Sequence, residues 1–181
     1  MEGASMTTAR PNPAQGPAAL RVLSPAPQDA TTLRRLRPIA VLTAATLGAI
    51  GAVHAAWAAG STWPYDDPST LTRSVLGVPE AGDFPPPGLT LAVTGALTVA
   101  AGAALARTSR SERVRRTARL LTLPAAGVLA LRGVGGFAQS LLAPNAATPE
   151  FTHNDLRIYS PLCLALAAGL AALEKSTKET A

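Results

Sequence analysis

Uncharged, apolar residues gather into long blocks along this chain, separated by polar segments. Residues 38–60, 88–106 and 120–142 form three such blocks, and Arg132 is the one charged residue within them. A helix rises about 1.5 Å per residue, so a block of about 20 residues spans the hydrocarbon core of a bilayer, which is about 30 Å thick. The pattern therefore predicts three transmembrane helices.

A fourth apolar block, residues 159–173, is too short to cross a bilayer as a helix. Extending it back to Thr152 gives a span of adequate length, residues 152–173. Thr152 then suits the N-cap and Asp155 suits the positive end of the helix dipole, while Pro161 falls inside the helix and should kink it. The alternative is a shorter helix capped by Ser160, and we favour the longer one.

Two local features of the blocks carry further expectations. The first block is longer than the apolar region of a secretory signal, so we favour a span over a leader cleaved near Ala58. We expect Pro38 at its first helical position and Gly60 at its C-terminal end. Glycines recur every seven residues in the second block, which predicts a stripe where another helix approaches closely; they are Gly88, Gly95 and Gly102.

Charge predicts the orientation in the membrane. Thirteen of the sixteen Lys and Arg residues lie in segments 1–37, 107–119 and 174–181, whereas segments 61–87 and 143–158 hold two. Because positive residues gather on the cytoplasmic side, both termini are expected inside and both acidic loops outside. Most arginines flank apolar blocks, so we read the net charge of +5 as a topology signal and expect no nucleic-acid partner.

Together these patterns predict an all-α integral membrane bundle of four transmembrane helices over residues 38–173. The proline-rich segment 1–37 is expected to be a disordered cytoplasmic tail, and 174–181 a second cytoplasmic tail. One cysteine and two histidines do not make a convincing metal site, and phosphate-binding or nucleophile motifs are missing. We therefore expect no metal and no cofactor.

Polar residues inside the spans are the candidates for chemistry. Arg132 lies near the middle of the third span, where a charge is expensive unless it faces the bundle interior or water. Asp155 and Tyr159, four residues apart, share a face of the fourth helix. The predicted topology places five polar residues in the outer half of the bundle as a candidate polar cluster: His54, Arg132, Gln139, Asp155 and Tyr159. Trp57 suits an interfacial anchor.

Three motifs in order resemble a known bacterial membrane family, catalogued as domain of unknown function 3995. They are His54–Gly60 (HAAWAAG), Leu131–Phe137 (LRGVGGF) and Asp155–Cys163 (DLRIYSPLC). The resemblance covers roughly residues 38–173 and implies four spans without an established activity. It also implies an acidic residue at position 136 in many relatives, where this chain has Gly136, and an aromatic residue in place of Asn154. Asp155 is therefore the expected counter-ion of Arg132.

The sequence thus favours a multi-pass protein of the bacterial inner (plasma) membrane, surrounded by lipid. Its function is expected to be non-enzymatic: a small binding, accessory or transport component, with a polar pocket near the outer face for a small ligand or a membrane-protein partner. The alternative is a membrane-embedded enzyme in which His54, Asp155 and Tyr159 perform acid–base chemistry and Arg132 binds an anionic group. That alternative requires these side chains to meet around an open cavity.

Overall fold

The computed structural model describes residues 27–78 and 85–175, and this part of the chain contains helices and no strands. Four stretches are long and apolar enough to cross a membrane: Thr31–Ala58, Pro87–Ala106, Glu112–Leu142 and Pro149–Glu174. The first three belong to α1 (Pro27–Ala58), α3 (Pro87–Ala106) and α4 (Glu112–Leu142). The fourth is composite: α5 (Pro149–Asn154), a π-helical turn (Asp155–Tyr159) and α6 (Ser160–Lys175). The predicted all-α, four-span fold is confirmed.

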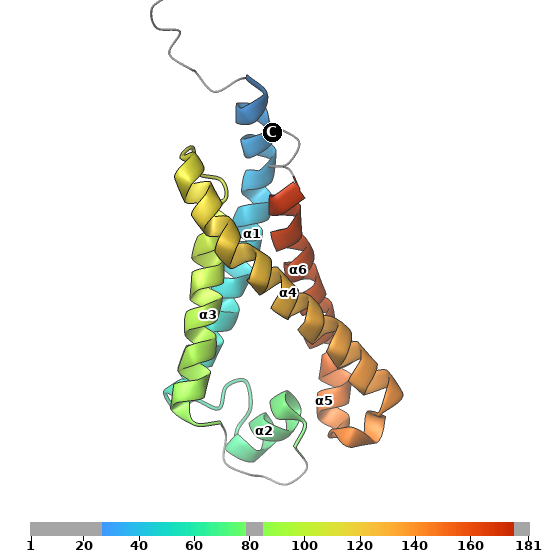
Figure 1. The fold of residues 1–181 in the computed structure, drawn as a ribbon. Helices are drawn as coiled ribbons and strands as arrows, with labels where there is room; N and C mark the ends of the chain where they lie inside the picture. The colour runs from blue at the N-terminus through green and yellow to red at the C-terminus, as the bar shows by residue number, and fades with distance from the viewer. Residues whose placement is uncertain (1–26, 79–84, 176–181) are drawn as a thin grey trace, which may run out of the picture.

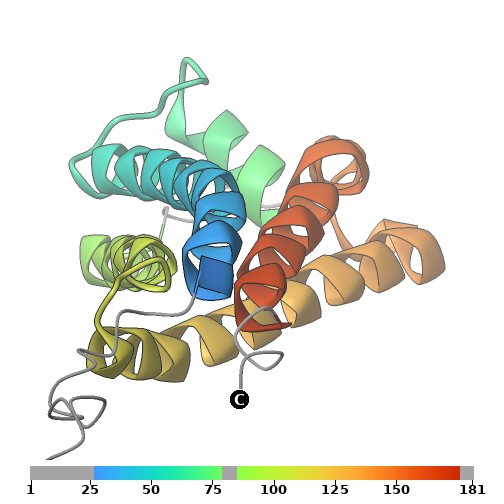
Figure 2. The same ribbon diagram turned by 90° about the horizontal axis from the view of Figure 1, so that it is seen from above.

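The spans form two helix pairs, α1 with α3 and α4 with α6. All four helices lie together at the end where α1 begins, α6 ends and α3 connects to α4, which we call the terminal end (Figures 1 and 2). Because α4 crosses the bundle diagonally, the two pairs diverge toward the opposite end (Figure 1). There the short helix α2 (Pro68–Leu76) lies near α5, and we call this the cap end.

The apolar core of the bundle is built from leucines and alanines, and the small alanines let the helix backbones approach closely. It draws on α1, α3 and α6, with members Leu36, Ala40, Ala44, Leu47, Ala100, Ala104, Leu166, Leu170 and Leu173. Large apolar side chains on the outside of the spans are exposed instead, among them Leu42, Leu89, Leu120, Val128 and Leu131. An apolar exterior on membrane-length helices is the surface that contacts lipid.

The start of α1 corrects the expected boundary of the N-terminal tail. The helix begins at Pro27, so residues 27–37 are helical, and Pro38 lies inside α1 rather than at its first position. Leu36 explains the extension, because its side chain is buried in the core cluster one turn before Ala40. The rest of the expected tail, residues 1–26, lies outside the described residues, as do residues 176–181.

Glycines act differently from one place to another. Gly60 has a φ of 92° directly after α1, and the amides of Gly60 and Ser61 bond to the carbonyls of Trp57 and Ala56. This Schellman motif ends the helix where expected. By contrast, a Cβ at any glycine of the α3 stripe would have nothing within 4 Å. The stripe at Gly88, Gly95 and Gly102 therefore does not face another of the described helices, contrary to the expectation.

Two helices of the second pair begin earlier than the sequence predicts. α4 begins at Glu112, so most of the basic segment before Leu120 is its first two turns. The composite fourth span begins at Pro149, and its N-cap is Thr148, whose Oγ1 accepts the amide of Phe151. Thr152 is thus not the cap. Thr148 is the better start because Pro149 suits the first helical position and Glu150 the first turn.

Candidate functional site

A buried carboxylate lies at the centre of the polar contacts between α4 and the π-helical turn. Asp155 is fully buried, and Arg132 Nη2 donates to its Oδ1 at 2.8 Å. Its other oxygen, Oδ2, accepts from Ser140 Oγ at 3.0 Å and from Ser160 Oγ at 2.8 Å. A buried charge needs this degree of satisfaction. We call these four residues the outer cluster.

The irregular helix at Asp155 explains how the carboxylate reaches α4. The amide of Ser160 bonds to the carbonyl of Asp155, five residues back, which is the π-helical spacing. Pro161 follows directly, and its ring and missing N–H disfavour regular α geometry in the preceding turn. The added residue per turn redirects side chains, which is why π turns are frequent at functional sites.

Arg132 is the member of the outer ion pair that the protein leaves partly exposed. Its side chain keeps 40% of its surface exposed while Asp155 is inaccessible. The guanidinium carbon lies 5.9 Å from the centre of the Phe151 ring, within the range of a cation–π contact. Only Nη2 has a polar partner among the described residues, so the other N–H groups of the guanidinium are free to meet a ligand or water.

The other members of the predicted polar cluster lie elsewhere. His54 Nδ1 lies 2.9 Å from the carbonyl of Ile50 on its own helix, and the centre of its ring lies 4.9 Å from that of Trp57, with the ring planes tilted by 54°. Tyr159 donates to the carbonyl of Ser74 in α2 at 3.2 Å. Gln139 is exposed, and its neighbour Ser140 faces Asp155 instead. The structure thus brings Arg132 and Asp155 together, but it places neither His54 nor Gln139 in contact with them.

Trp57, the predicted anchor, lies in the last turn of α1, and its Nε1 donates to the carbonyl of Trp63 at 2.6 Å. The contact ties the end of the helix to the loop that follows. Trp63 itself is exposed. The role of Trp57 as an interfacial anchor stays a prediction.

The cap helix α2 docks on the second helix pair. Asp67 caps it by accepting the amide of Thr70, and Gly77 ends it with a φ of 72°. Thr148 fastens α2 to α5 twice: its Oγ1 donates to the carbonyl of Arg73 at 2.6 Å, and its amide to that of Gly77 at 3.1 Å. Phe151 is buried beneath this contact. The loop between α1 and α3 therefore reaches across to the helix pair that holds Asp155.

A family comparison places the outer cluster within a recognised domain. Residues 47–170 match the family described as "Protein of unknown function (DUF3995)". The chain belongs to the DUF3995 family. No curated protein and no solved structure matches it. The resemblance stated from the three motifs is thus confirmed, and all four residues of the outer cluster fall inside the DUF3995 match.

Position 136 shows how this DUF3995 protein is built around Asp155. A Cβ built on Gly136 would overlap Ser160 Oγ and Arg132 Nη1 and would lie 2.7 Å from Asp155 Oδ2. The carboxylate from the π-helical turn therefore occupies the space that a side chain at position 136 would need. Here the partner of Arg132 comes from the last span rather than from its own helix.

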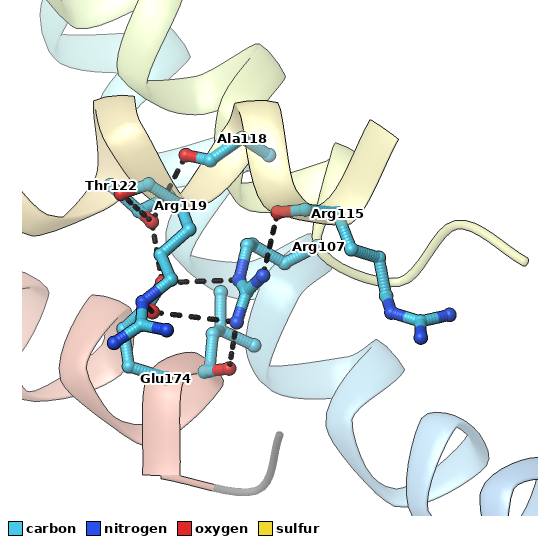
Figure 3. A network of polar contacts seen from close by, with 7 residues as sticks. Arg107, Arg115, Ala118, Arg119, Thr122 and Glu174 are labelled. Atoms are coloured by element: carbon cyan, nitrogen blue, oxygen red, sulfur yellow. Dashed lines mark hydrogen bonds and ion pairs between the residues drawn. The ribbon is translucent and has the colours of Figure 1, made fainter. Parts of the chain in front are cut away.

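A second buried ion-pair network, which the sequence analysis missed, lies at the terminal end (Figure 3). The carboxylate of Glu174 pairs with Arg107 Nε at 3.0 Å and Arg119 Nε at 3.2 Å. It also accepts from Thr122 Oγ1 at 2.6 Å. Arg107 further donates to the carbonyls of Arg115 and Leu173. We call Arg107, Arg119, Thr122 and Glu174 the inner cluster.

The inner cluster connects three helices of the DUF3995 fold at the point where they converge. Arg107 follows α3, Arg119 and Thr122 lie on α4, and Glu174 lies on α6. The side chains of Arg107 and Glu174 are only 3% and 9% exposed. Burial lowers the pKa of Arg107, and the charge of Glu174 opposes that shift. Glu174 stands four residues beyond the family match, and the sequence assigned it to the tail.

The described residues offer few side chains that could perform acid–base chemistry or bind a metal. Within the described ranges, 27–78 and 85–175, no group of three or more His, Cys, Asp or Glu residues could hold a metal ion. Each acid or base of the alternative enzyme hypothesis already has a partner within the protein. The exposed part of the Arg132 guanidinium remains available to a ligand, as does the second ring nitrogen of His54, whose contact with Ile50 uses Nδ1 alone.

Proposed function

We propose that this multi-pass membrane protein is a binding component rather than an enzyme, and that Arg132 holds an acceptor group of its ligand, a carboxylate or a phosphate. The single observation that carries the proposal is the half-exposed guanidinium fixed at one nitrogen by a buried carboxylate. Such an arginine is already oriented, so little side-chain freedom is lost when a planar anion binds its open edge.

The contacts of the remaining candidates support binding over catalysis. A general base must lie within hydrogen-bond reach of the proton that it takes. His54 is engaged with Ile50, Tyr159 with Ser74, and Asp155 with three donors. Asp155 is also inaccessible, so a substrate has no route to its oxygens. These engagements favour a positioning role for Asp155, which keeps Arg132 in place.

We further propose that the terminal end faces the cytoplasm and that the membrane is the bacterial plasma membrane. The distribution of Lys and Arg supports this orientation. Reporter fusions after residues 75 and 148 should then report outside, and fusions at residue 112 and after residue 181 should report inside. An inside signal after residue 75 would contradict the orientation.

The binding proposal is tested by thermal unfolding of the purified full chain in detergent. Acetate and inorganic phosphate are titrated at constant ionic strength against chloride. Wild-type protein should show a saturable rise in Tm with at least one of the two anions, because ligands of the folded state stabilise it by mass action. The rise should disappear in the paired variant Arg132→Gln/Asp155→Asn, which removes both charges together and leaves no buried carboxylate uncompensated.

Arg157→Gln provides the matched control, since Arg157 is an exposed arginine in the π-helical turn that also holds Asp155, with a contact to His153. It should keep the anion-dependent rise. An equal rise in the paired variant, or no saturable rise with either anion in wild type, would overturn the proposal.

A further inference from the structure

The first turns of α4 and the loop just before it carry exposed arginines whose charge the ion pairs of the protein neutralise only in part. Arg110 and Arg113 are exposed and have no ion-pair partner among the described side chains. Arg116 is 80% exposed and shares Glu112 with Arg115. The other carboxylate nearby, Glu174, is enclosed in the inner cluster. This surface therefore carries more positive charge than its one exposed carboxylate, Glu112, can neutralise.

The same face of α4 continues directly into an apolar surface. Arg113, Arg116, Leu120 and Leu123 follow one another at spacings of three and four residues, so they line one side of the helix. Leu120 is 73% exposed, and Leu123 is exposed as well. From Arg113 to Leu123 the helix rises about 15 Å. We call these four residues the α4 stripe.

The inner cluster holds this part of α4 in place. Arg107 donates to the carbonyl of Arg115 at 2.7 Å, and Arg119 pairs with Glu174 on α6. Both contacts lie on the side of α4 that faces the bundle, as Figure 3 shows for the side chains of Arg107 and Glu174. The stripe is thus presented on a helix that is fastened to two other helices. It does not need to be ordered when a ligand arrives.

We propose that the α4 stripe is a binding site for one anionic phospholipid: Arg113 and Arg116 hold the headgroup phosphate, and an acyl chain lies along Leu120 and Leu123. A charge signal for topology requires only positive residues near a span. In the stripe, the arginines precede the leucines along one face of the helix. This order places the cations at the level of the lipid headgroup and the leucines at the level of the acyl chains, so it matches the two parts of a lipid. Arginine suits the phosphate because its planar guanidinium binds two oxygens at once. The proposal does not depend on the function proposed for Arg132.

The test uses the full chain in nanodiscs of phosphatidylcholine mixed with phosphatidylglycerol, followed by extraction into detergent and native mass spectrometry. Because nanodiscs expose both leaflets, the orientation of a variant has no effect. Wild-type protein should retain phosphatidylglycerol over phosphatidylcholine. Arg113→Gln/Arg116→Gln should reduce that retention by about thirtyfold, the effect expected of two arginines at a charged membrane surface. Excess inorganic phosphate should not displace the lipid, because it lacks the acyl chain.

Two variants separate site binding from general charge. Arg73→Gln/Arg157→Gln removes two exposed arginines at the cap end and should retain the lipid like wild type. Leu120→Ser/Leu123→Ser keeps every charge and should also lose retention. Equal retention in the Arg113→Gln/Arg116→Gln protein and in wild type would overturn the proposal. Equal loss in the cap-end variant would overturn it too, because the effect would then follow net charge.

Discussion

The two buried ion-pair clusters at opposite ends of the bundle use the same chemistry in different settings. In the outer cluster the carboxylate is buried and the arginine is 40% exposed, and both lie within one helix pair. In the inner cluster the Arg107–Glu174 pair is enclosed and joins three helices, while Arg119, which shares the same carboxylate, is 44% exposed. An ion pair that is closed on all sides can only hold a structure together. One with an open cation can hold a structure and still meet a ligand.

Removing the carboxylate of the inner cluster should have the largest effect. Glu174→Gln leaves Arg107 buried without its counter-ion, which costs about 3–5 kcal/mol of the free energy of unfolding. Unfolding in mixed micelles at rising denaturing-detergent content measures it. Glu112→Gln is the control, because Glu112 pairs with exposed arginines and should cost less than about 1 kcal/mol. Equal costs for the two variants would show that Arg107 is not buried as described.

Removing the carboxylate charge of the outer cluster should lower the free energy of unfolding by a smaller amount. Asp155→Asn keeps the shape of the side chain and its contacts with the serines but removes the charge. Because the protein leaves 40% of the Arg132 side chain uncovered, its cation is less enclosed than that of Arg107, and we expect a loss of about 1–3 kcal/mol. The same mixed-micelle unfolding measures it. A loss as large as that of Glu174→Gln would contradict the difference in exposure between Arg107 and Arg132.

Glycine substitutions sharpen the contrast between packed and lipid-facing surfaces. Gly136→Ala places a Cβ against Ser160, Arg132 and Asp155, and we expect a loss of about 1–3 kcal/mol from overpacking. Gly95→Ala on α3 meets nothing within 4 Å and should leave the stability unchanged or slightly higher. Thermal unfolding of both variants provides the comparison. Equal destabilisation would mean that the α3 stripe is packed after all.

The smallest expected effect on stability is that of titrating Asp67, which caps α2. Hydrogen bonds from Ser69, and then from Thr70, lower the pKa of Asp67 to about 2. A carboxyl with a lowered pKa in the folded state contributes stability above its unfolded pKa of about 4. That contribution is lost as the pH falls through about 2. An NMR titration should place the midpoint near the lower value and show it rising in Ser69→Ala. A midpoint near the unfolded value in wild type would contradict the capping geometry.

The sequence carried enough information for the fold and for one of the two clusters. Four apolar blocks, the last of them extended back to Thr152, predicted the spans, because lipid admits few other structures. Arg132 was visible as a lone charge inside a block, and Asp155 as a carboxylate near the start of another. Their pairing could be expected because a charge in a span persists only when it is paired or solvated.

The inner cluster could not be predicted from the sequence in the same way. Arg107 and Glu174 stand just outside the apolar blocks, where charges are ordinary, so nothing in the pattern marks them as buried. Their burial results from the convergence of three helices at the terminal end, which is a tertiary property. The serines around Asp155 were missed for a related reason: the π-helical turn decides which residues share its face, and its irregular spacing breaks the regular helical period.

The pairing of Arg132 with Asp155 is the centre of this account, and a double-mutant cycle tests it most directly. Arg132→Gln, Asp155→Asn and the combined variant are compared with wild type by unfolding in mixed micelles. We predict that the combined variant loses less stability than the sum of the two single variants, with a coupling of about 1 kcal/mol or more. It should also be milder than Asp155→Asn alone, because no uncompensated cation remains. Additive losses would show that the two side chains do not interact, and the outer cluster would then have no basis.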